Sequence, residues 1–173
     1  MSDMDAPEEI VWQGRFITTK KRGRWEYVSR ARGIKAAVIL AVEDGHVLLV
    51  EQFRVPLGAN CLELPAGLVG DEVAGEAFEL AAARELEEET GYRPAHIELV
   101  GEYHSSPGMV SESFFFVRAH GLEKVSEGGG VEGENITVHR VAMAEVGGFI
   151  ATKRAEGCAI DAKLLMLTVS PFG

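Results

Sequence analysis

The chain has 173 residues, with 27 acidic and 17 basic side chains and a net charge of −10. Hydrophobic residues make up 46% and charged residues 25%, which is typical of a globular protein with one core and excludes collagen, coiled coil and wholesale disorder. No run of eighteen apolar residues is present, which excludes a membrane-spanning helix. The acidic balance makes nucleic acid and anionic membranes unfavourable partners.

The first ten residues are acidic and contain no apolar stretch, so no secretory signal is expected there. The two cysteines, Cys61 and Cys158, are too few for a disulfide framework or a Cys-rich zinc site. We therefore expect two reduced thiols and a cytoplasmic location.

Residues 10–31 predict two short strands, around Val11–Thr18 and Trp25–Arg30. The basic cluster Lys20-Lys21-Arg22-Gly23 between them is typical of a hairpin turn. This segment is too short to be stable alone, and its apolar residues need another surface to pack on.

Two apolar runs, Ala36–Glu43 and His46–Phe53, predict the next strands. Asp44-Gly45 joins them and favours a tight hairpin, because both residues accept positive φ angles. Cys61–Leu64 predicts a further short strand, which Pro65-Ala66-Gly67 is expected to end.

From about Gly75 to Thr90 the pattern becomes helical, with apolar residues at three- and four-residue spacing and Gly91 at the position of a left-handed C-cap. The segment 126–134 is glycine-rich and is expected to be a flexible loop. The remaining predicted elements are three strands and two helices: Ile97–Tyr103, Ser113–Ala119, Ile136–Met143, Val146–Lys153 and Asp161–Val169, with Asp161 as an N-cap. Strands outnumber helices and do not alternate with them, which predicts an α+β fold.

The charges are unevenly distributed along the chain. Eight of the 17 basic residues fall between positions 15 and 35, whereas Glu85, Glu87, Glu88 and Glu89 concentrate acidic charge on the predicted helix. Glu85, Glu88 and Glu89 lie on one side of that helix, where like charges repel unless a cation lies between them. Carboxylate oxygens are the ligands that Mg²⁺ and Mn²⁺ prefer, and Arg84 is spaced to orient Glu88.

The segment 70–92 matches a known signature. Gly70, Glu76 and the run Arg84-Glu85-Leu86-Glu87-Glu88-Glu89-Thr90-Gly91-Tyr92 have the residues and spacing of the Nudix box, so the chain resembles the Nudix hydrolases. In that family the box glycine is usually the one in Pro-Ala-Gly, here Gly67. Eight residues separate Gly67 from Glu76 instead of five, so either Gly70 takes the box position or the loop carries a three-residue insertion, which we favour.

Three further parts of the chain resemble the ADP-ribose pyrophosphatase group: 25–30, 51–54 followed by 62–67, and 106–112, with Pro107 at the position of a proline found after the box. The resemblance implies a Nudix fold, with a mixed sheet between helices in an α/β/α sandwich. It also implies an N-terminal β subdomain at residues 1–33 and a hydrolase domain at residues 34–173.

The resemblance also implies roles for individual residues. Glu85, Glu88 and Glu89, with the carbonyl of Ala66, would hold Mg²⁺ or Mn²⁺, and Arg84 and Glu88 belong to the catalytic set. Glu112 would be the general base, with Glu134 as the alternative. Trp25 would stack on the nucleobase of the substrate, and Arg30, Arg54 and Pro107 would contact the rest of the substrate.

The activity implied is metal-dependent hydrolysis of ADP-ribose, or a related nucleoside diphosphate sugar, to AMP and a sugar phosphate. GDP-mannose or another nucleotide sugar is the alternative substrate, and a non-catalytic binding module is the third interpretation. Relatives build the site with N-terminal strands from a partner, which implies a homodimer with strand exchange.

Overall fold

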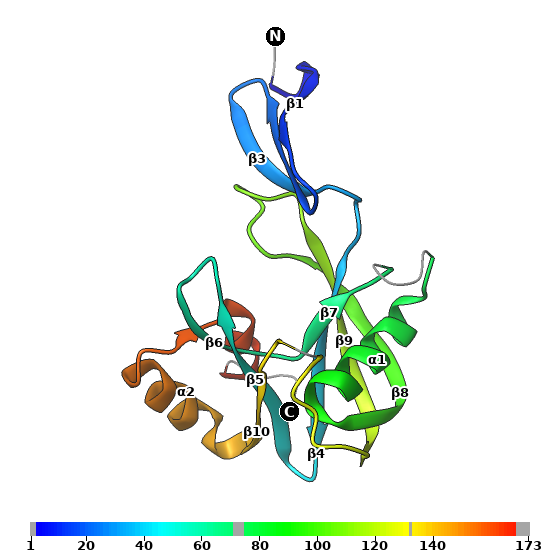
Figure 1. Cartoon of the computed structure of the whole chain (residues 1–173), viewed down its shortest axis with the longest axis vertical. Helices are drawn as coiled ribbons and strands as arrows, with labels where there is room; N and C mark the ends of the chain where they lie inside the picture. The colour runs from blue at the N-terminus through cyan, green and yellow to red at the C-terminus, as the bar shows by residue number, and fades with distance from the viewer. Residues whose placement is uncertain (1–2, 71–74, 132, 169–173) are drawn as a thin grey trace.

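The computed structural model describes residues 3–70, 75–131 and 133–168. Three strands near the N-terminus form a separate antiparallel sheet in the order β1-β2-β3: β1 (Glu8–Gln13), β2 (Ile17–Arg22) and β3 (Trp25–Arg30). This N-terminal sheet stands apart from the rest of the molecule, at the top of Figure 1. The predicted boundary at residues 33 and 34 falls in the link between it and the main sheet.

The expected single strand Val11–Thr18 was wrong. The chain turns between β1 and β2, where the N–H of Gly14 donates to the carbonyl of Ile17 at 2.9 Å. The expected turn at Lys20–Gly23 was also misplaced, because Lys20 to Arg22 belong to β2 and only Gly23, with φ +57°, makes the turn. The basic residues remain extended because Glu8 on β1 pairs with Lys20 and Arg22 across the sheet.

The main sheet is mixed and follows the order β11-β6-β5-β4-β9-β8, with β10 paired to β5 and β7 paired to β4. Its strands are β4 (Ala36–Glu43), β5 (His46–Arg54), β6 (Ala59–Glu63), β7 (Ala66–Leu68), β8 (Tyr92–His104), β9 (Ser113–Lys124), β10 (Thr137–Ala142) and β11 (Ala159–Ile160). The β4–β9 and β6–β11 pairs are parallel and the others antiparallel. Asp44 and Gly45 both have positive φ angles, which confirms the hairpin between β4 and β5.

The expected strand at Cys61–Leu64 ends before Pro65, as predicted, because β6 ends at Glu63. The pairing of Ala66–Leu68 with β4 as β7 was not predicted. The expected helix 161–169 begins instead as a 3₁₀ turn, η3 (Ala162–Leu164), and continues as the short α3 (Leu165–Thr168). Asp161 caps it as predicted, accepting from the N–H of Lys163 at 2.7 Å. Residue 169 lies outside the described residues.

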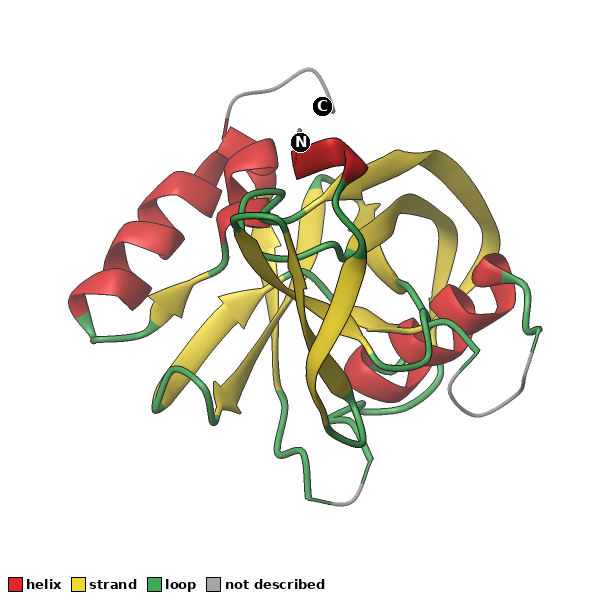
Figure 2. Ribbon diagram, turned by 90° about the horizontal axis from the view of Figure 1, so that it is seen from above, coloured by secondary structure: helices red, strands yellow, loops and turns green. Residues whose placement is uncertain are grey.

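Helices cover both faces of the main sheet (Figure 2). Side chains of β4 alternate between two cores. Val38 and Leu40 pack with α2 (Val146–Ala155) and η3, whereas Ala37 and Ile39 pack with α1 (Phe78–Thr90). A short 3₁₀ turn, η2 (Met143–Glu145), leads into α2, and another, η1 (Asp3–Asp5), precedes β1. This is the predicted α+β sandwich, and no helix among its described residues has the length and apolar character needed to cross a membrane.

Candidate active site

Helix α1 carries the acidic side chains of the site. It begins at Phe78, three residues later than expected, and ends at Gly91, whose φ of +78° confirms the predicted C-cap. Leu86 and two alanines bury one side of the helix against β4. This packing directs Glu85 and Glu89 into a cavity at β7.

The cavity has a volume of about 400 Å³ and gathers residues from distant parts of the chain. Seven of the residues expected at the site line it: Arg30, Arg54, Ala66, Glu85, Glu89, Glu112 and Glu134. They come from β3, β5, β7, α1 and two loops. The cavity therefore brings carboxylates and guanidinium groups to one place, although the two kinds of residue are separated in the sequence.

Glu89 is a deeply buried carboxylate of the cavity, with 6% of its surface exposed. Burial raises its pKa to about 8; the N–H of Ala66, which donates to Glu89 Oε2 at 3.0 Å, opposes this shift, and the nearby carboxylates of Glu85 and Glu134 add to it. Desolvation and like charge both disfavour the ionised form. A cation placed here would relieve both costs.

Glu85 is held by a close approach of the backbone. A Cβ atom at Gly67 would lie 1.9 Å from Glu85 Cδ, so only glycine fits beside this carboxylate. Gly67 is the glycine of Pro-Ala-Gly, which agrees with our preference for it as the box glycine. Most of the proposed insertion, residues 71–74, lies outside the described residues.

Arg84 lies among the acidic residues of the box. Its guanidinium is 3.2 Å from Glu88 Oε2, 3.0 Å from Glu85 Oε1 and 3.7 Å from Glu76 Oε2. Glu88 does not line the cavity, because Arg84 holds it to one side on the surface of α1. Arg84 thus orients two of the predicted metal ligands, including Glu88 as its spacing predicted.

The donor set fits a divalent cation. Among the described residues, no three His, Cys, Asp or Glu side chains are already clustered for metal binding. Glu85 and Glu89 nevertheless line one cavity and present carboxylate oxygens to it, and Glu85 is packed so closely against Gly67 that a Cβ there would displace it. Hard oxygen ligands of this kind suit Mg²⁺ or Mn²⁺. The contact seen at Ala66 involves its N–H, and the predicted role of its carbonyl remains a prediction.

Both arginines of the cavity are paired with carboxylates. Arg30 Nε and Nη2 are 2.7 and 2.6 Å from Glu112 Oε1. Arg54 makes a two-pronged contact with the buried Glu63, at 2.6 and 2.8 Å. Glu134, the alternative base, accepts from the N–H of Val131 at 2.9 Å. Each of these side chains therefore has a defined orientation.

The glycine-rich segment 126–131 was expected to be part of a flexible loop, but it packs against the end of α1 and is hydrogen-bonded to it. Its N–H groups at Gly129 and Gly130 donate to the carbonyls of Glu89 and Glu88, at 2.8 and 3.0 Å. A Cβ at Gly128 would lie 2.4 Å from the backbone of Thr90, so the glycine-rich segment and the end of α1 are in direct contact. Glu132, within the same predicted loop, lies outside the described residues.

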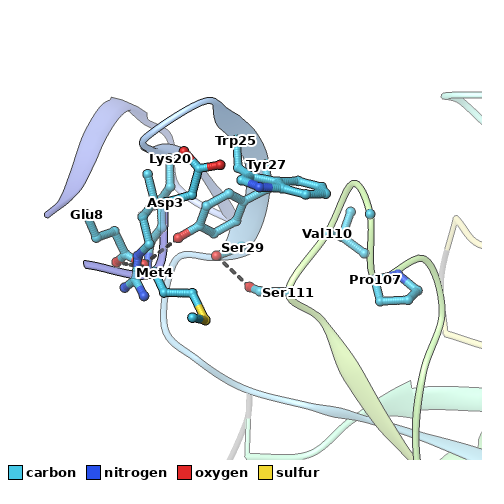
Figure 3. Close-up of a pocket in the computed structure, with 12 residues that line it drawn as sticks. Asp3, Met4, Glu8, Lys20, Trp25, Tyr27, Ser29, Pro107, Val110 and Ser111 are labelled. Atoms are coloured by element: carbon cyan, nitrogen blue, oxygen red, sulfur yellow. Dashed lines mark hydrogen bonds and ion pairs between the residues drawn. The ribbon is translucent and has the colours of Figure 1, made fainter. Parts of the chain in front are cut away.

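Trp25 and Pro107 do not line the carboxylate cavity. They face each other across a second cavity of about 730 Å³, between the N-terminal sheet and the loop before β9 (Figure 3). Tyr27 and Val110 also line it. The second cavity is formed within one chain, and Trp25 remains 54% exposed.

Two charged residues of the carboxylate cavity were missed by sequence reasoning. Glu63 pairs with Arg54 and belongs to the segment 62–67, which resembles the relatives. The resemblance could therefore have indicated Glu63 as a site residue. Lys163 also lines the cavity and pairs with Asp161. No sequence pattern indicated Lys163, because the C-terminal segment comes near the cavity only through tertiary contacts.

Gly67→Ala is expected to weaken binding of Mg²⁺ about ten- to a hundredfold, because the added Cβ must displace Glu85. Activity titrated against Mg²⁺ concentration measures this. Gly148→Ala on α2 is the matched control, since a Cβ there meets nothing within 4 Å. Equal Mg²⁺ dependence in the two variants would contradict the placement of Glu85 in the metal site.

The comparisons with known proteins agree with this geometry. Residues 31–146 match the family model described as the NUDIX domain. The chain is 35% identical to the ADP-sugar pyrophosphatase of Mus musculus over 59% of the chain, and 36% identical to the GDP-mannose pyrophosphatase of Cronobacter sakazakii over 79%. A crystal structure described as an ADP compounds hydrolase covers 84% of the chain and is itself covered to 80%, with a TM-score of 0.68 at 24% identity, and shows the shared fold.

The aligned region covers only part of the relatives. It spans 54% of the mouse protein and 72% of the bacterial one, and 55% of putative nudix hydrolase 2 from Caenorhabditis elegans. Residues 31–146, which match the family model, nevertheless contain the whole of α1, both candidate general bases and the residues around Gly67. On this match and on the fold, the chain belongs to the Nudix domain family.

Proposed function

We propose that the protein hydrolyses the pyrophosphate bond of a nucleoside diphosphate sugar, with ADP-ribose as the leading substrate, in the presence of Mg²⁺ or Mn²⁺. The observation that carries this proposal is the cavity in which Glu85 and Glu89 face Arg30, Arg54, Glu112 and Glu134. A pyrophosphate needs neutralising charge, a positioned water and a group that accepts its proton, and this cavity holds residues for all three.

In the proposed reaction, Glu85 and Glu89 would hold the divalent cation, which would supply charge neutralisation at the pyrophosphate, and Glu88 would contribute from outside the cavity, where Arg84 holds it. Arg30 and Arg54 bind phosphate oxygens, for which the planar guanidinium is suited. Glu112 takes a proton from water as its oxygen attacks one phosphorus. The bond from that phosphorus to the bridging oxygen breaks, and ADP-ribose yields AMP and ribose 5-phosphate.

We infer that the nucleoside binds in the second cavity, against Trp25. Neighbouring residues connect the two cavities, because Ser29 and Ser111 line the second cavity while Arg30 and Glu112 line the first. A nucleoside diphosphate sugar would therefore have its nucleobase beside Trp25 and its phosphates beside Arg30.

Trp25→Ala is expected to raise KM about five- to tenfold with a smaller change in kcat, because stacking on an aromatic ring contributes about 1 kcal/mol. Steady-state kinetics measures the split, and Trp25→Phe, which preserves an aromatic face, is the control. An unchanged KM in Trp25→Ala would show that the nucleobase of the substrate binds away from Trp25.

GDP-mannose is the second candidate substrate. The GDP-mannose pyrophosphatase of C. sakazakii matches 79% of this chain, against 59% for the mouse ADP-sugar pyrophosphatase. The deciding experiment compares kcat/KM with Mg²⁺ for ADP-ribose, GDP-mannose, ADP-glucose, diadenosine polyphosphates and NADH. A tenfold preference for ADP-ribose supports the proposal, a preference for GDP-mannose selects the alternative, and no hydrolysis of any substrate favours a non-catalytic module.

We also propose that the protein is a homodimer joined through its N-terminal sheet. Large apolar side chains of β1 and of the turn that follows it are more than half exposed in the single chain: Ile10, Val11, Trp12 and Phe16. A second copy would bury them, with strand exchange as one arrangement. Arg30 already reaches the cavity of its own chain, so a partner is not needed to supply it.

Val11→Lys is expected to shift the protein from dimer to monomer in sedimentation velocity, because the charge would be buried in the interface. Val55→Lys, on the exposed hairpin between β5 and β6, is the control and should leave the dimer intact. A wild-type protein that sediments as a monomer at micromolar concentration would contradict the dimer.

A further inference from the structure

The loop before β9 is attached to the N-terminal sheet. The N–H of Val28 on β3 donates to the carbonyl of Met109 at 3.0 Å, and the N–H of Ser111 donates to the carbonyl of Val28 at 2.9 Å. Val28 and Val110 thereby form a parallel bridge outside the regular strands. Figure 1 shows the loop rising from the main body to reach β3.

Two side-chain contacts continue this pairing along β3. Ser29 Oγ and Ser111 Oγ are 2.6 Å apart, and Ser29 is 8% exposed (Figure 3). One residue further along, Arg30 pairs with Glu112. Three consecutive residues of β3 thus hold the four residues that lead up to and include Glu112.

The anchor matters because the loop has few other supports. Residues 105–109 are exposed, and exposed loops without buried contacts are usually the most flexible parts of a protein. A base must be held within hydrogen-bonding distance of the water it deprotonates, and a displacement of about 1 Å can cost about a hundredfold in rate. The hydroxyl pair is a part-buried, directional contact of the anchor, one residue before Glu112.

We propose that Ser29 is a positioning residue for Glu112: through Ser111 it fixes the loop to β3, so the N-terminal sheet takes part in catalysis by holding the base. This inference rests on the proposed role of Glu112. Ser29 touches no reacting atom and acts only through the loop. The hydrogen bond between two hydroxyls cannot form once either is removed.

Ser29→Ala tests the proposal against a matched control. Thr18 lies opposite Ser29 on β2, the middle strand of the N-terminal sheet, and is also buried, whereas the backbone of the loop pairs with β3. Thr18→Val also removes one buried hydroxyl. Ser29→Ala is expected to lower kcat about ten- to a hundredfold with less than about a twofold change in KM, whereas Thr18→Val retains kcat and Ser29→Thr restores it.

Two further measurements separate positioning from general destabilisation. Hydrogen exchange at the Ser111 amide should accelerate in Ser29→Ala at unchanged exchange of β4, because the loop is released while the core is not. In a Glu112→Gln background, Ser29→Ala should cost no additional activity, because there is no base left to position.

Unchanged exchange at Ser111 would overturn the anchor, and accelerated exchange with unchanged kcat would overturn positioning. Additive losses in the double variant would show that Ser29 acts by another route, which also overturns the proposal. Full activity of Glu112→Gln itself would refute the proposed base as well, and so distinguishes failure of the function from failure of this inference.

Discussion

Glu89→Gln is expected to lose about a hundred- to a thousandfold in kcat/KM while keeping its fold. A group that holds a charge-neutralising cation contributes several kcal/mol to transition-state stabilisation, and each 1.4 kcal/mol is about tenfold in rate. Glutamine preserves the size of the side chain and can still accept from the N–H of Ala66, so the packing is retained. Kinetics at saturating Mg²⁺ measures the loss.

The same variant is expected to be more stable than the wild type when metal is removed with EDTA. The pKa of Glu89 is raised from 4.5 to about 8 by burial, so the folded protein binds a proton that the unfolded chain releases. This cost is absent below pH 4.5, grows as pH rises and is complete above about pH 8. Glutamine does not ionise and avoids it, so the difference in Tm should widen between pH 5 and 8.

Addition of Mg²⁺ should then raise the Tm of the wild type more than that of Glu89→Gln, because a ligand that binds only the folded state stabilises it. Glu87→Gln is the control, since Glu87 is paired with Arg93 on the outer side of α1. Parallel Tm curves for Glu89→Gln and wild type across this pH range, with equal response to Mg²⁺, would remove Glu89 from the metal site.

Glu112→Gln is expected to lower kcat about a hundred- to ten-thousandfold, the range that general bases contribute. KM should change little, because a base acts in the transition state and not in ground-state binding. Rapid-quench and steady-state kinetics distinguish a slowed chemical step from slowed product release.

Glu134→Gln is the comparison for this experiment. Glu134 lines the same cavity and is held by the N–H of Val131, so the geometry supports either carboxylate as the base. We expect the milder loss at Glu134. A severe loss there with a mild loss at Glu112 would exchange the two roles, while leaving the metal site unaffected.

The helix and its C-cap could be predicted from the sequence because they are local. The spacing of Glu85, Glu88 and Glu89 and the glycine at position 91 depend only on neighbours within two turns. The hairpin at Asp44-Gly45 was readable for the same reason, since the two residues alone set the turn geometry. The mixed sheet between helices also followed, through the resemblance to the family.

What failed depended on long-range contacts. The basic run Lys20 to Arg22 has the composition of a turn, yet it is extended because Glu8 pairs with it from another strand. Pro65-Ala66-Gly67 ends β6 as its composition predicts, but the pairing of Ala66–Leu68 with β4 as β7 was missed. Lys163 enters the cavity only because the C-terminal segment folds back against β6. No local pattern encodes these pairings, and the ion pair of Arg30 with Glu112, 82 residues apart, belongs to the same class.

The glycine-rich segment that closes α1 links two parts of the site mechanically. Gly129 and Gly130 bind the carbonyls of the residues that would hold the metal, and four residues beyond Gly130 the chain delivers Glu134 into the cavity. Fraying of the last turn of α1 would therefore release Glu134 and loosen Glu89 in the same event. We therefore expect the end of α1 and this segment to open together in hydrogen exchange, because each is held by hydrogen bonds to the other.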